Sequence, residues 1–488
     1  MRIRRISLGL LVVLGIGLCA LMVEAQSWAH SYFSDWTDLR CESVLRTSDE
    51  GFILVGSIAR STVLALPRQM LIMKTDDNGR LVWQGSYPEH PFGFLTHGTC
   101  IQEVEEGYVV AGYSFDEGSF RSSTLVFKLG YDGQLIWQML YRSEFYDTSP
   151  SSMATTLDGQ VVIAGRIEPA AIVEEETLRE LGGPLDEDFL VMKLDAANGS
   201  ILWQRSFDHG YGEAATSIAR SNGSRLIVAG NYKGALDDGD IWILELNEDG
   251  GIAGQKNFAG NGEDNVTSII TAADREFVIA GSTDSEGTGP IGVLSVKFTL
   301  APLQPFTWAR AYDAVRSQNL GYAVCETSNN DLVIAGAHST GTYWRPGIFG
   351  SGSIAYSWDG LIFMLNPDGQ PLWTFTYGGD QDDEFRSVES ASGGMAYRDI
   401  VVGGYNESFP SPALSGKKVY AMNLRSNGRI DGDDSCMLHG VDIAARNLDL
   451  LCPCMPAEDR KLALEPIDLR FGFGRLELQS MRLCEDLP

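Results

Sequence analysis

The chain repeats one short pattern seven times: a turn, followed by an apolar strand that ends in glycine. The pattern is clearest in Asp49–Gly56, Glu106–Gly112 and Asp158–Gly165, and the last four copies close at Gly230, Gly281, Gly336 and Gly404. Consecutive closing glycines are 51 to 68 residues apart. Self-similarity at such a period is typical of repeat architectures. The 488 residues are therefore predicted to form one array of units, although their length alone would allow about three separate domains.

Two further motifs accompany the glycine strand. One is a strand that runs into a tight turn containing Asn-Gly or Asp-Gly, as at Lys74–Gly79 and Lys128–Gly133; seven copies occur if a degenerate one beginning at Lys297 is included. The other is a strand in which Tyr or Phe follows Trp by four residues, as in Trp83 and Tyr87. Asn-Gly and Asp-Gly between apolar runs predict hairpins, because such turns need positive φ. Together with an inner strand, these motifs predict four strands in each unit.

The Trp strands are displaced by one unit along the chain. No Trp strand follows the last turn, Asn423–Gly428, whereas Trp28 and Tyr32 stand alone before the first unit. A closed ring explains this offset, because the N-terminal strand then completes the last unit beside Tyr420–Leu424; an open stack would instead need capping ends. We therefore predict an all-β fold, a seven-bladed β-propeller of four-stranded blades, over residues 26–432.

The repeat unit resembles a known group of propellers. Its Asp-x-x-x-Gly-x-x-x-Trp core, seen at Asp195–Trp203, resembles the secreted β-propeller repeats of bacteria and archaea and is similar to the Trp-docking motif of the quinoprotein (PQQ-like) propeller superfamily. The resemblance implies that the repeated Gly and Trp dock one blade onto the next. It also implies a structural role for these residues.

The N-terminus has the order of a secretory signal. Arg2, Arg4 and Arg5 precede the apolar run Ile6–Val23, and Val23 and Ala25 supply small residues at positions −3 and −1 of a predicted cleavage site after Ala25. Residues 1–25 are thus expected to be a signal peptide, leaving an extracellular or periplasmic protein without a membrane span. A lipoprotein modified at Cys19 and a retained anchor are the alternatives.

The charge balance excludes some partners. Lys and Arg total 37 against 65 Asp and Glu, a net charge of −28. Nucleic acids and anionic membrane surfaces are bound mainly through Lys and Arg, so neither is an expected partner. We expect a monomer that binds a protein or a polysaccharide.

Variation in length is concentrated in loops on one face of the predicted ring, which marks that face as free to carry function. The insertion Glu168–Glu187 contains a predicted short helix within Ile172–Leu181. A second insertion, Ser339–Trp358, is rich in aromatic residues that we interpret as a candidate partner-binding platform for carbohydrate or peptide: Tyr343, Trp344, Phe349, Tyr356 and Trp358. The alternative is that these side chains pack the insertion onto its blade.

Acidic residues precede the inner strands on the same face. Five of them form a candidate metal-binding ring at the mouth of the channel: Asp38, Asp147, Glu213, Asp264 and Asp383. Carboxylate oxygens are ligands that Ca²⁺ prefers, so the ring is predicted to bind Ca²⁺ or a cationic partner. The alternative is a repeated strand-start cap on a solvated surface. No other cofactor is predicted.

The last residues, 433–488, depart from the repeat. Four cysteines lie there, and export into an oxidising compartment would permit disulfides between them: Cys436, Cys452, Cys454 and Cys484. Their connectivity is left open. The alternating segment Leu469–Leu478 suggests a hairpin, so a small disulfide-stapled C-terminal appendage is predicted.

No catalytic motif is present: there is no His-Glu-x-x-His pair, no Gly-x-Ser-x-Gly elbow and no phosphate-binding Gly-Lys-Ser loop. We therefore expect a secreted, non-catalytic scaffold that binds its partner through the variable acidic face. The alternatives are a propeller enzyme, such as a quinoprotein-like dehydrogenase or a polysaccharide lyase, and a purely structural envelope scaffold.

Overall fold

The computed structural model describes residues 27–430 and five short segments of the tail. Within 27–430, it leaves out residues 34–37, 60–67, 87–93, 172, 182–183, 211, 234–238, 286–290, 302–305, 315–316, 347–351, 391–399 and 409–415. The tail segments are 438–440, 443–447, 458–461, 465–468 and 479–482. The predicted signal peptide lies outside the described residues.

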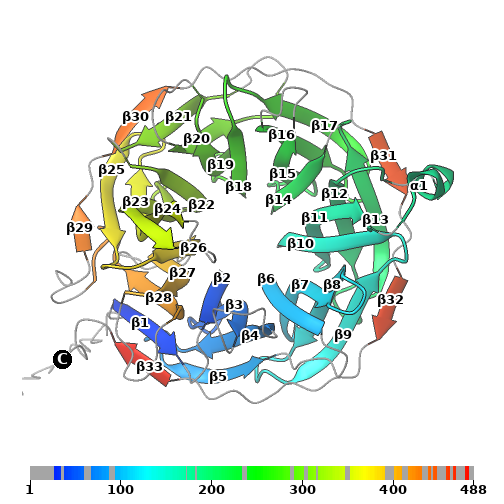
Figure 1. Cartoon of the computed structure of the whole chain (residues 1–488), viewed down its shortest axis with the longest axis horizontal. Coiled ribbons are helices and arrows are strands. Elements are labelled where there is room, and N and C mark those ends of the chain that lie inside the picture. The colour runs from blue at the N-terminus through cyan, green and yellow to red at the C-terminus, as the bar shows by residue number, and fades with distance from the viewer. Residues whose placement is uncertain are drawn as a thin grey trace, which may run out of the picture.

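Twenty-eight antiparallel strands form seven four-stranded blades around a central channel, as predicted (Figure 1). The inner strands are β2 (Asp38–Arg46), β6 (Phe94–Val104), β10 (Tyr146–Thr155), β14 (Glu213–Arg220), β18 (Asp264–Thr271), β22 (Asn319–Glu326) and β26 (Asp383–Ser390). The second strands are β3 (Phe52–Ala59), β7 (Gly107–Asp116), β11 (Val161–Pro169), β15 (Leu226–Lys233), β19 (Phe277–Thr283), β23 (Leu332–Pro346) and β27 (Ile400–Asn406).

The third strands are β4 (Arg68–Thr75), β8 (Arg121–Leu129), β12 (Asp188–Leu194), β16 (Gly239–Leu246), β20 (Gly292–Phe298), β24 (Gly352–Leu365) and β28 (Lys418–Leu424). The outer strands are β5 (Leu81–Ser86), β9 (Leu135–Arg142), β13 (Ile201–Asp208), β17 (Ile252–Phe258), β21 (Trp308–Asp313), β25 (Pro371–Tyr377) and β1 (Trp28–Phe33). We number the blades 1 to 7 by their inner strands, from β2 to β26.

The first strand closes the ring in the predicted register. β1 is the outer strand of blade 7 and pairs antiparallel with β28, with Trp28 opposite Asn423 and Tyr32 opposite Val419. The chain thus joins its N-terminal strand to the last repeat. This pairing confirms that the displaced Trp strand at the N-terminus signals ring closure.

The apolar core is divided among the junctions between blades. Seven clusters of buried side chains are present, and each combines residues from two neighbouring blades. The second and third strands are buried on both faces, which explains their nearly continuous apolar runs. Burial between blades, and not within any one blade, therefore holds the ring together.

A Trp from one blade docks on a glycine turn of the next at six junctions. At the closing junction, the Trp28 indole N–H donates to the Asp77 carbonyl at 2.8 Å, and the Tyr32 hydroxyl donates to the Gly79 carbonyl at 2.6 Å. Gly79 has φ of 74°, and a Cβ there would lie 2.9 Å from the Trp28 ring. Glycine is thus required at this turn both by its φ and by the close approach of the indole. The other docked residues are Trp83, Trp137, Trp203, Trp308 and Trp373.

The C-terminal tail forms a belt around the ring instead of a separate unit in its described residues. Five short strands each add to the outer edge of a blade: β29 (Leu438–Gly440), β30 (Ala444–Asn447), β31 (Glu458–Lys461), β32 (Glu465–Asp468) and β33 (Gln479–Arg482). They pair in chain order with β25, β21, β13, β9 and β1. Figure 1 shows them in orange and red around the circumference. The described part of the predicted small appendage thus lies along the ring, because the backbone edges of the blades offer partners that the tail uses one after another.

Three cysteines of the ring carry free thiols. Cys41, Cys100 and Cys325 are buried in inner strands, and burial raises the pKa of each thiol above its usual value. The four tail cysteines and the predicted hairpin at Leu469–Leu478 lie outside the described residues, so the disulfides stay a prediction. No helix among the described residues has the length and apolar character needed to cross a membrane.

Replacing Trp28 by Ala is expected to weaken the closure of the ring. Trp28 is only 2% exposed and is docked on the first blade, so the free energy of unfolding should fall by about 3–5 kcal/mol. Urea denaturation measures this change. Val82→Ala is the control, because Val82 lies on the outer strand of blade 1 and is 61% exposed. Equal effects of the two substitutions would contradict the proposed role of Trp28.

Truncation after Gly432 removes the belt and leaves the ring. We expect native-like far-UV circular dichroism, a lower melting temperature and more self-association, because five backbone edges become open to other chains. Calorimetry and size-exclusion chromatography test this expectation. A truncated chain with an unchanged melting temperature that stays monomeric would contradict a stabilising belt.

Candidate functional site

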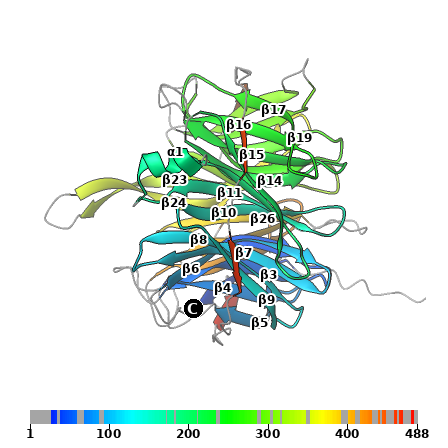
Figure 2. The same cartoon turned by 90° about the vertical axis from the view of Figure 1, so that its right-hand side faces the viewer.

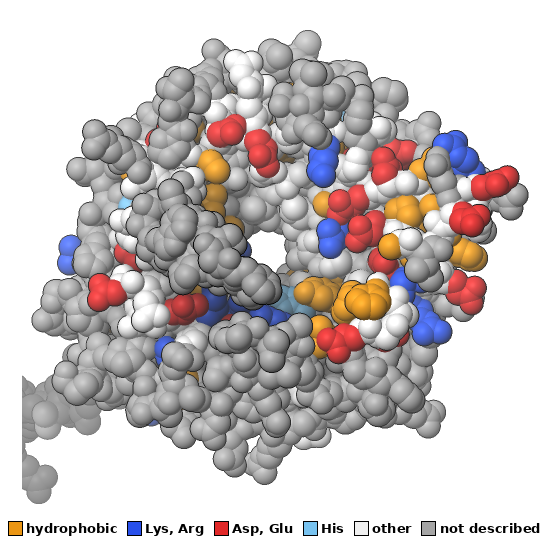
Figure 3. All heavy atoms as spheres, viewed as in Figure 1, with side chains coloured by type: hydrophobic (Ala, Val, Ile, Leu, Met, Phe, Trp, Pro, Cys, Tyr) orange, Lys and Arg blue, Asp and Glu red, His pale blue; other side chains and the backbone are white. Residues whose placement is uncertain are grey.

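The connections between second and third strands lie on the same face as those from each outer strand to the next inner strand. We call this the loop face. The long β23–β24 hairpin and α1 (Glu175–Leu181) both project from this side of the ring (Figure 2). The helix confirms the prediction for this insertion, and its Leu178, 3% exposed, packs into the core between blades 2 and 3. Figure 3 shows the loop face, with the channel open at its centre.

The inner strands of all seven blades line the channel, which has a volume of about 460 Å³. Each inner strand contains a β-bulge at the same place in its pairing with the second strand. The residue after the bulge is small, and Ser occupies this position in five blades: Ser43, Ser152, Ser217, Ser268 and Ser387. Four of these hydroxyls accept a hydrogen bond from a backbone N–H of the next blade. The residue after the bulge thus joins neighbouring blades beside the channel at four of the seven junctions.

The channel wall is charged on one side. The bulge residues of blades 1, 6 and 7 are Glu42, Tyr322 and Arg386, whereas blades 2 to 5 carry Thr or Ser at the same position. Figure 3 shows Lys and Arg side chains and a His gathered at this wall, over β26, β2 and β6. In a chain with a net charge of −28, such a local group of cations is an exception.

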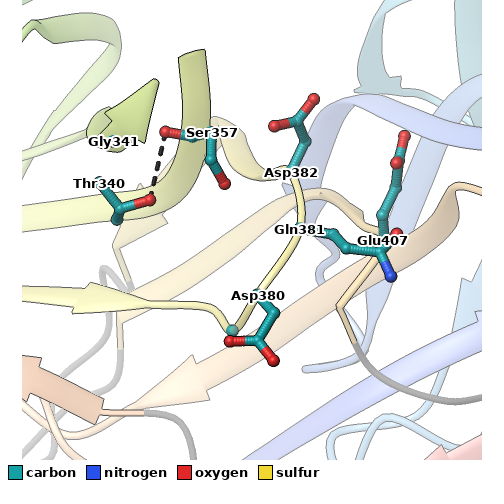
Figure 4. A pocket seen from close by; sticks show the side chains of 8 residues that line it. Thr340, Gly341, Ser357, Asp380, Gln381, Asp382 and Glu407 are labelled. Carbon is teal, nitrogen blue, oxygen red and sulfur yellow. Dashed lines mark hydrogen bonds between the residues drawn. The ribbon is translucent and has the colours of Figure 1, made fainter. Parts of the chain in front are cut away.

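An acidic cleft opens on the loop face between blades 6 and 7 (Figure 4). It has a volume of about 570 Å³ and is lined by Thr340, Gly341, Ser357, Gly379, Asp380, Gln381, Asp382 and Glu407. Asp380 is exposed, while the Asp382 carboxylate accepts the backbone N–H of Trp358 at 3.3 Å. Lys417 lies 3.7 Å from Glu407. The cleft therefore presents three carboxylates and one neighbouring ammonium group.

A buried carboxylate supports the floor of this cleft. Asp383 is fully buried and accepts hydrogen bonds from the Ser408 hydroxyl at 2.5 Å and from the Gly379 N–H at 3.1 Å. Burial raises the pKa of Asp383 to about 7, with a further contribution from Asp359, while its hydrogen bonds act in the opposite direction. Asp383 thus caps the start of β26 and ties the loop before it to the end of β27.

The other members of the predicted acidic ring also have partners near their own strands. Arg40 and Arg68 contact Asp38, Arg121 contacts Asp147 at 2.6 Å, and the Ser285 hydroxyl donates to Asp264 at 2.8 Å. Glu213 is buried. These contacts favour the strand-start cap over a shared ring, and Ca²⁺ binding by the five residues stays a prediction.

One group of described carboxylates is close enough to share a cation. Oxygen atoms of Asp186, Asp188 and Asp208 lie within 4.8 Å of one another beside the outer strand of blade 3. None of the five residues of the predicted ring belongs to this group. Sequence reasoning missed it because Asp186 and Asp208 are distant in the chain and meet only when β12 pairs with β13.

The predicted aromatic loop is largely a two-stranded ribbon. Strands β23 and β24 continue beyond the blade, with Tyr343 opposite Ala355, Trp344 opposite Ile354 and Tyr356 opposite Thr342. Trp358, opposite Ser339, lies where the ribbon joins the blade. Phe349 lies outside the described residues. The ribbon borders the acidic cleft, because Thr340, Gly341 and Ser357 line it.

The charged channel wall was also missed. Arg40, Tyr322, Arg386 and Tyr405 belong to no motif, because the repeats were defined by residues that are alike in every blade. The bulge position contains a signal that could have found them: aligning the inner strands on the small residue after the bulge shows Thr or Ser in four blades and charged or aromatic residues in three.

Comparison with known proteins finds no matching family and only distant structural similarity. No known family and no curated protein matches the sequence significantly. Solved structures similar to the chain include a protein of unknown function from Dyadobacter fermentans, at 10% identity and a TM-score of 0.42, over 82% of this chain and 98% of that one. The endosialidase of phage phi92 is 10% identical with a TM-score of 0.41, over 83% and 69% of the two chains. A mannose phosphorylase from Leishmania mexicana is 10% identical, with a TM-score of 0.30 over 59% and 88%. None of these similarities is strong enough to assign an activity.

A buried carboxyl group in the channel is expected to make the stability of the protein depend on pH. Burial raises the pKa of Glu389, which lines the channel, to about 7. The unfolded chain loses this proton at lower pH than the folded chain. The contribution of Glu389 to the free energy of unfolding should therefore be complete below about pH 4.5 and be lost as the pH rises to 7. Glu389→Gln imitates the protonated side chain. It should match the wild type at pH 4 and exceed it at pH 8 by roughly 1–3 kcal/mol in the free energy of unfolding.

Denaturation with urea at both pH values measures the effect of Glu389→Gln. Glu105→Gln is the matched control, because Glu105 is exposed in a turn on the opposite face. The interpretation fails if the Glu389 variant is less stable than the wild type at pH 8, or if the control gains equally.

Proposed function

We propose that the protein is a secreted binding propeller that holds a protein or an extracellular polymer on its loop face. The acidic cleft between blades 6 and 7 carries this proposal. It combines a volume of about 570 Å³ with the carboxylates of Asp380, Asp382 and Glu407, and these surround an opening to solvent. A site of this size and charge suits a cationic group of a partner, such as a Lys or Arg side chain or the amine of a polymer.

Two features of the surroundings support binding at the cleft. The β23–β24 ribbon borders it and carries three of the predicted partner-binding residues, Tyr343, Trp344 and Tyr356. Hydrogen bonds hold the rest of the blade in place. Asp380 is exposed and lies outside the core. A rigid blade junction with polar groups at its rim loses little conformational entropy when a partner binds. The predicted signal peptide, which would direct the chain to the extracellular space or the periplasm, is consistent with such a partner.

The charge of the cleft can be removed without altering its volume. The triple variant Asp380→Asn, Asp382→Asn, Glu407→Gln should lose at least tenfold in affinity for a cationic peptide or for a binding cell-wall fraction, as measured by interferometry. The control is Glu50→Gln, Glu105→Gln, Glu248→Gln, which removes three exposed charges from the opposite face. Equal losses in the two variants would show that only the total charge matters and would contradict a specific cleft.

The ribbon is tested separately. Trp344→Ala should weaken binding of the same ligand while leaving the melting temperature unchanged, because the ribbon extends beyond the four-stranded blade. Unchanged affinity would remove the aromatic platform from the proposal and leave the cleft in place.

Calcium binding is tested by calorimetry. If Ca²⁺ is a ligand, heat and a higher melting temperature are expected on its addition, and Asp208→Asn or Asp38→Asn will show which group of carboxylates is responsible. Absence of both effects in the wild-type protein would remove the calcium prediction.

A further inference from the structure

Beyond the cleft, four cations converge on the charged wall of the channel. Arg40, Arg68 and Arg386 each retain 30% of their side-chain exposure, and Lys417 retains 15%. They come from blades 1 and 7, which meet at the junction that β1 closes. We call these residues, together with the acidic and aromatic side chains that hold them, the arginine wall.

Aromatic rings and carboxylates fix the positions of the cations. The Lys417 ammonium lies 3.4 Å from the centre of the Tyr405 ring, and the Arg386 guanidinium lies 4.2 Å from the centre of the Tyr322 ring. The Tyr405 hydroxyl donates to Glu384 at 2.5 Å, and Glu384 in turn pairs with Arg386 at 2.6 Å. This network holds extended side chains in one arrangement, so little entropy would remain to be lost on binding a ligand.

The carboxylates of the wall do not use all of its N–H groups. The Asp38 carboxylate forms ion pairs with Arg40, at 3.2 Å, and with Arg68, at 2.8 Å, so two guanidinium groups share one negative charge. The Nε of Arg386 is buried and has no hydrogen-bond partner among the described residues, so a ligand would meet the terminal N–H groups of this side chain, which is 30% exposed. A guanidinium has five N–H donors, and those left over at a partly exposed position are available to a ligand.

The cations of the wall are matched by carboxylates, among them Glu42 and Glu384, so an anionic ligand would be held by the N–H donors that these groups leave unused and not by a surplus of positive charge at the wall. Next to it, His97 stacks on Tyr113 with ring centres 5.3 Å apart. Burial lowers the pKa of His97 to about 4, and Arg68, Arg40 and Arg386 lower it further, against a weaker opposite effect of Asp38. The net charge of −28 does not prevent an anion from approaching, because charges more than about 8 Å apart are largely screened at physiological ionic strength.

The opposite side of the channel carries neutral hydroxyl groups. On β10, Ser149 and Ser151 alternate with buried residues, which places them on the channel side of the strand. A ligand in the channel would thus meet guanidinium groups on one side and hydroxyl groups on the other. A carboxylate matches the first, because arginine binds it through two parallel hydrogen bonds. Hydroxyl groups of a sugar match the second.

We propose that the channel mouth binds the carboxylate of an acidic saccharide, with Arg40 and Arg386 as its direct ligands and the serines of β10 facing its hydroxyl groups. Its direct ligands do not line the acidic cleft, although Lys417 of the wall pairs with Glu407 of the cleft at 3.7 Å. The test therefore varies the direct ligands and leaves Glu407 unchanged, so that this site and the proposed function fail separately.

The test uses the full chain and defined probes. Titration calorimetry with oligogalacturonate, galacturonate monomer and a neutral galactose oligomer should show binding of the acidic sugars and none of the neutral one. Binding of the oligomer alone points to a polymer as the source of the carboxylate, and equal binding of the monomer points to a free sugar acid; both support the site.

Variants locate the site. Arg40→Gln and Arg386→Gln should each weaken binding at least tenfold, whereas Arg40→Lys and Arg386→Lys, which retain the charge and guard against loss of folding, should weaken it less. Arg225→Gln is the matched control: Arg225 pairs with Glu245 outside the channel and should not affect binding. The double variant Asp380→Asn, Asp382→Asn of the acidic cleft, which leaves Glu407 and its contact with Lys417 unchanged, should also bind normally.

Several results would overturn this assignment. These are absence of binding of both acidic sugars at millimolar concentration, equal binding of the neutral oligomer, or an equal loss in Arg225→Gln. Displacement of galacturonate by inorganic phosphate at the same concentration would overturn the selectivity for carboxylate.

Discussion

The contact between a Trp of one blade and a glycine turn of the next determines the rest of this structure. At six junctions the indole lies against the glycine, and its N–H donates to a carbonyl of the same turn. The contact requires a residue without Cβ at positive φ, which explains why Asn-Gly and Asp-Gly recur so regularly. The remaining junction has Gly254 in the Trp position, and there Lys256 donates to the Thr299 carbonyl at 2.5 Å instead. A hydrogen bond to the next blade is thus retained where the aromatic contact is lost.

Features that recur in every blade were predictable from sequence, because each copy of a motif is separate evidence for the same structural requirement. The number of blades, the order of strands and the closing strand at Trp28 follow from such recurrence and are confirmed. The belt was not predictable in this way. Its strands are three or four residues long and follow no common pattern, and they are stabilised by backbone edges far away in the chain. Edge pairing of this kind leaves little trace in side-chain periodicity.

The candidate sites were only partly predictable for a related reason. The acidic residues before the inner strands were recognised, and the cleft contains Asp380 and Asp382 from one of these loops. What those residues contact depends on neighbours that come together only when the strands of a blade pair: Asp38 meets Arg68 from the third strand of its blade, and Glu384 meets Tyr405 from the second. The bulge gives each blade one position that points a side chain into the channel. Three blades use this position for charged or aromatic residues, so a structural irregularity needed for packing also supplies the sites where blades can differ in chemistry.

Closure by β1 has a consequence for the order in which the protein is made. The strand that begins at Trp28 leaves the ribosome first, and its partner strand ends about 400 residues later. At typical rates of synthesis, this interval lasts roughly 20–80 s. Throughout that time the apolar β1 has no native partner, and blade 1 lacks the indole that covers its glycine turn. The fold therefore demands that its first strand be kept unpaired until its last blade exists. The belt, made later still, can pair with the blades only after all seven have been synthesised.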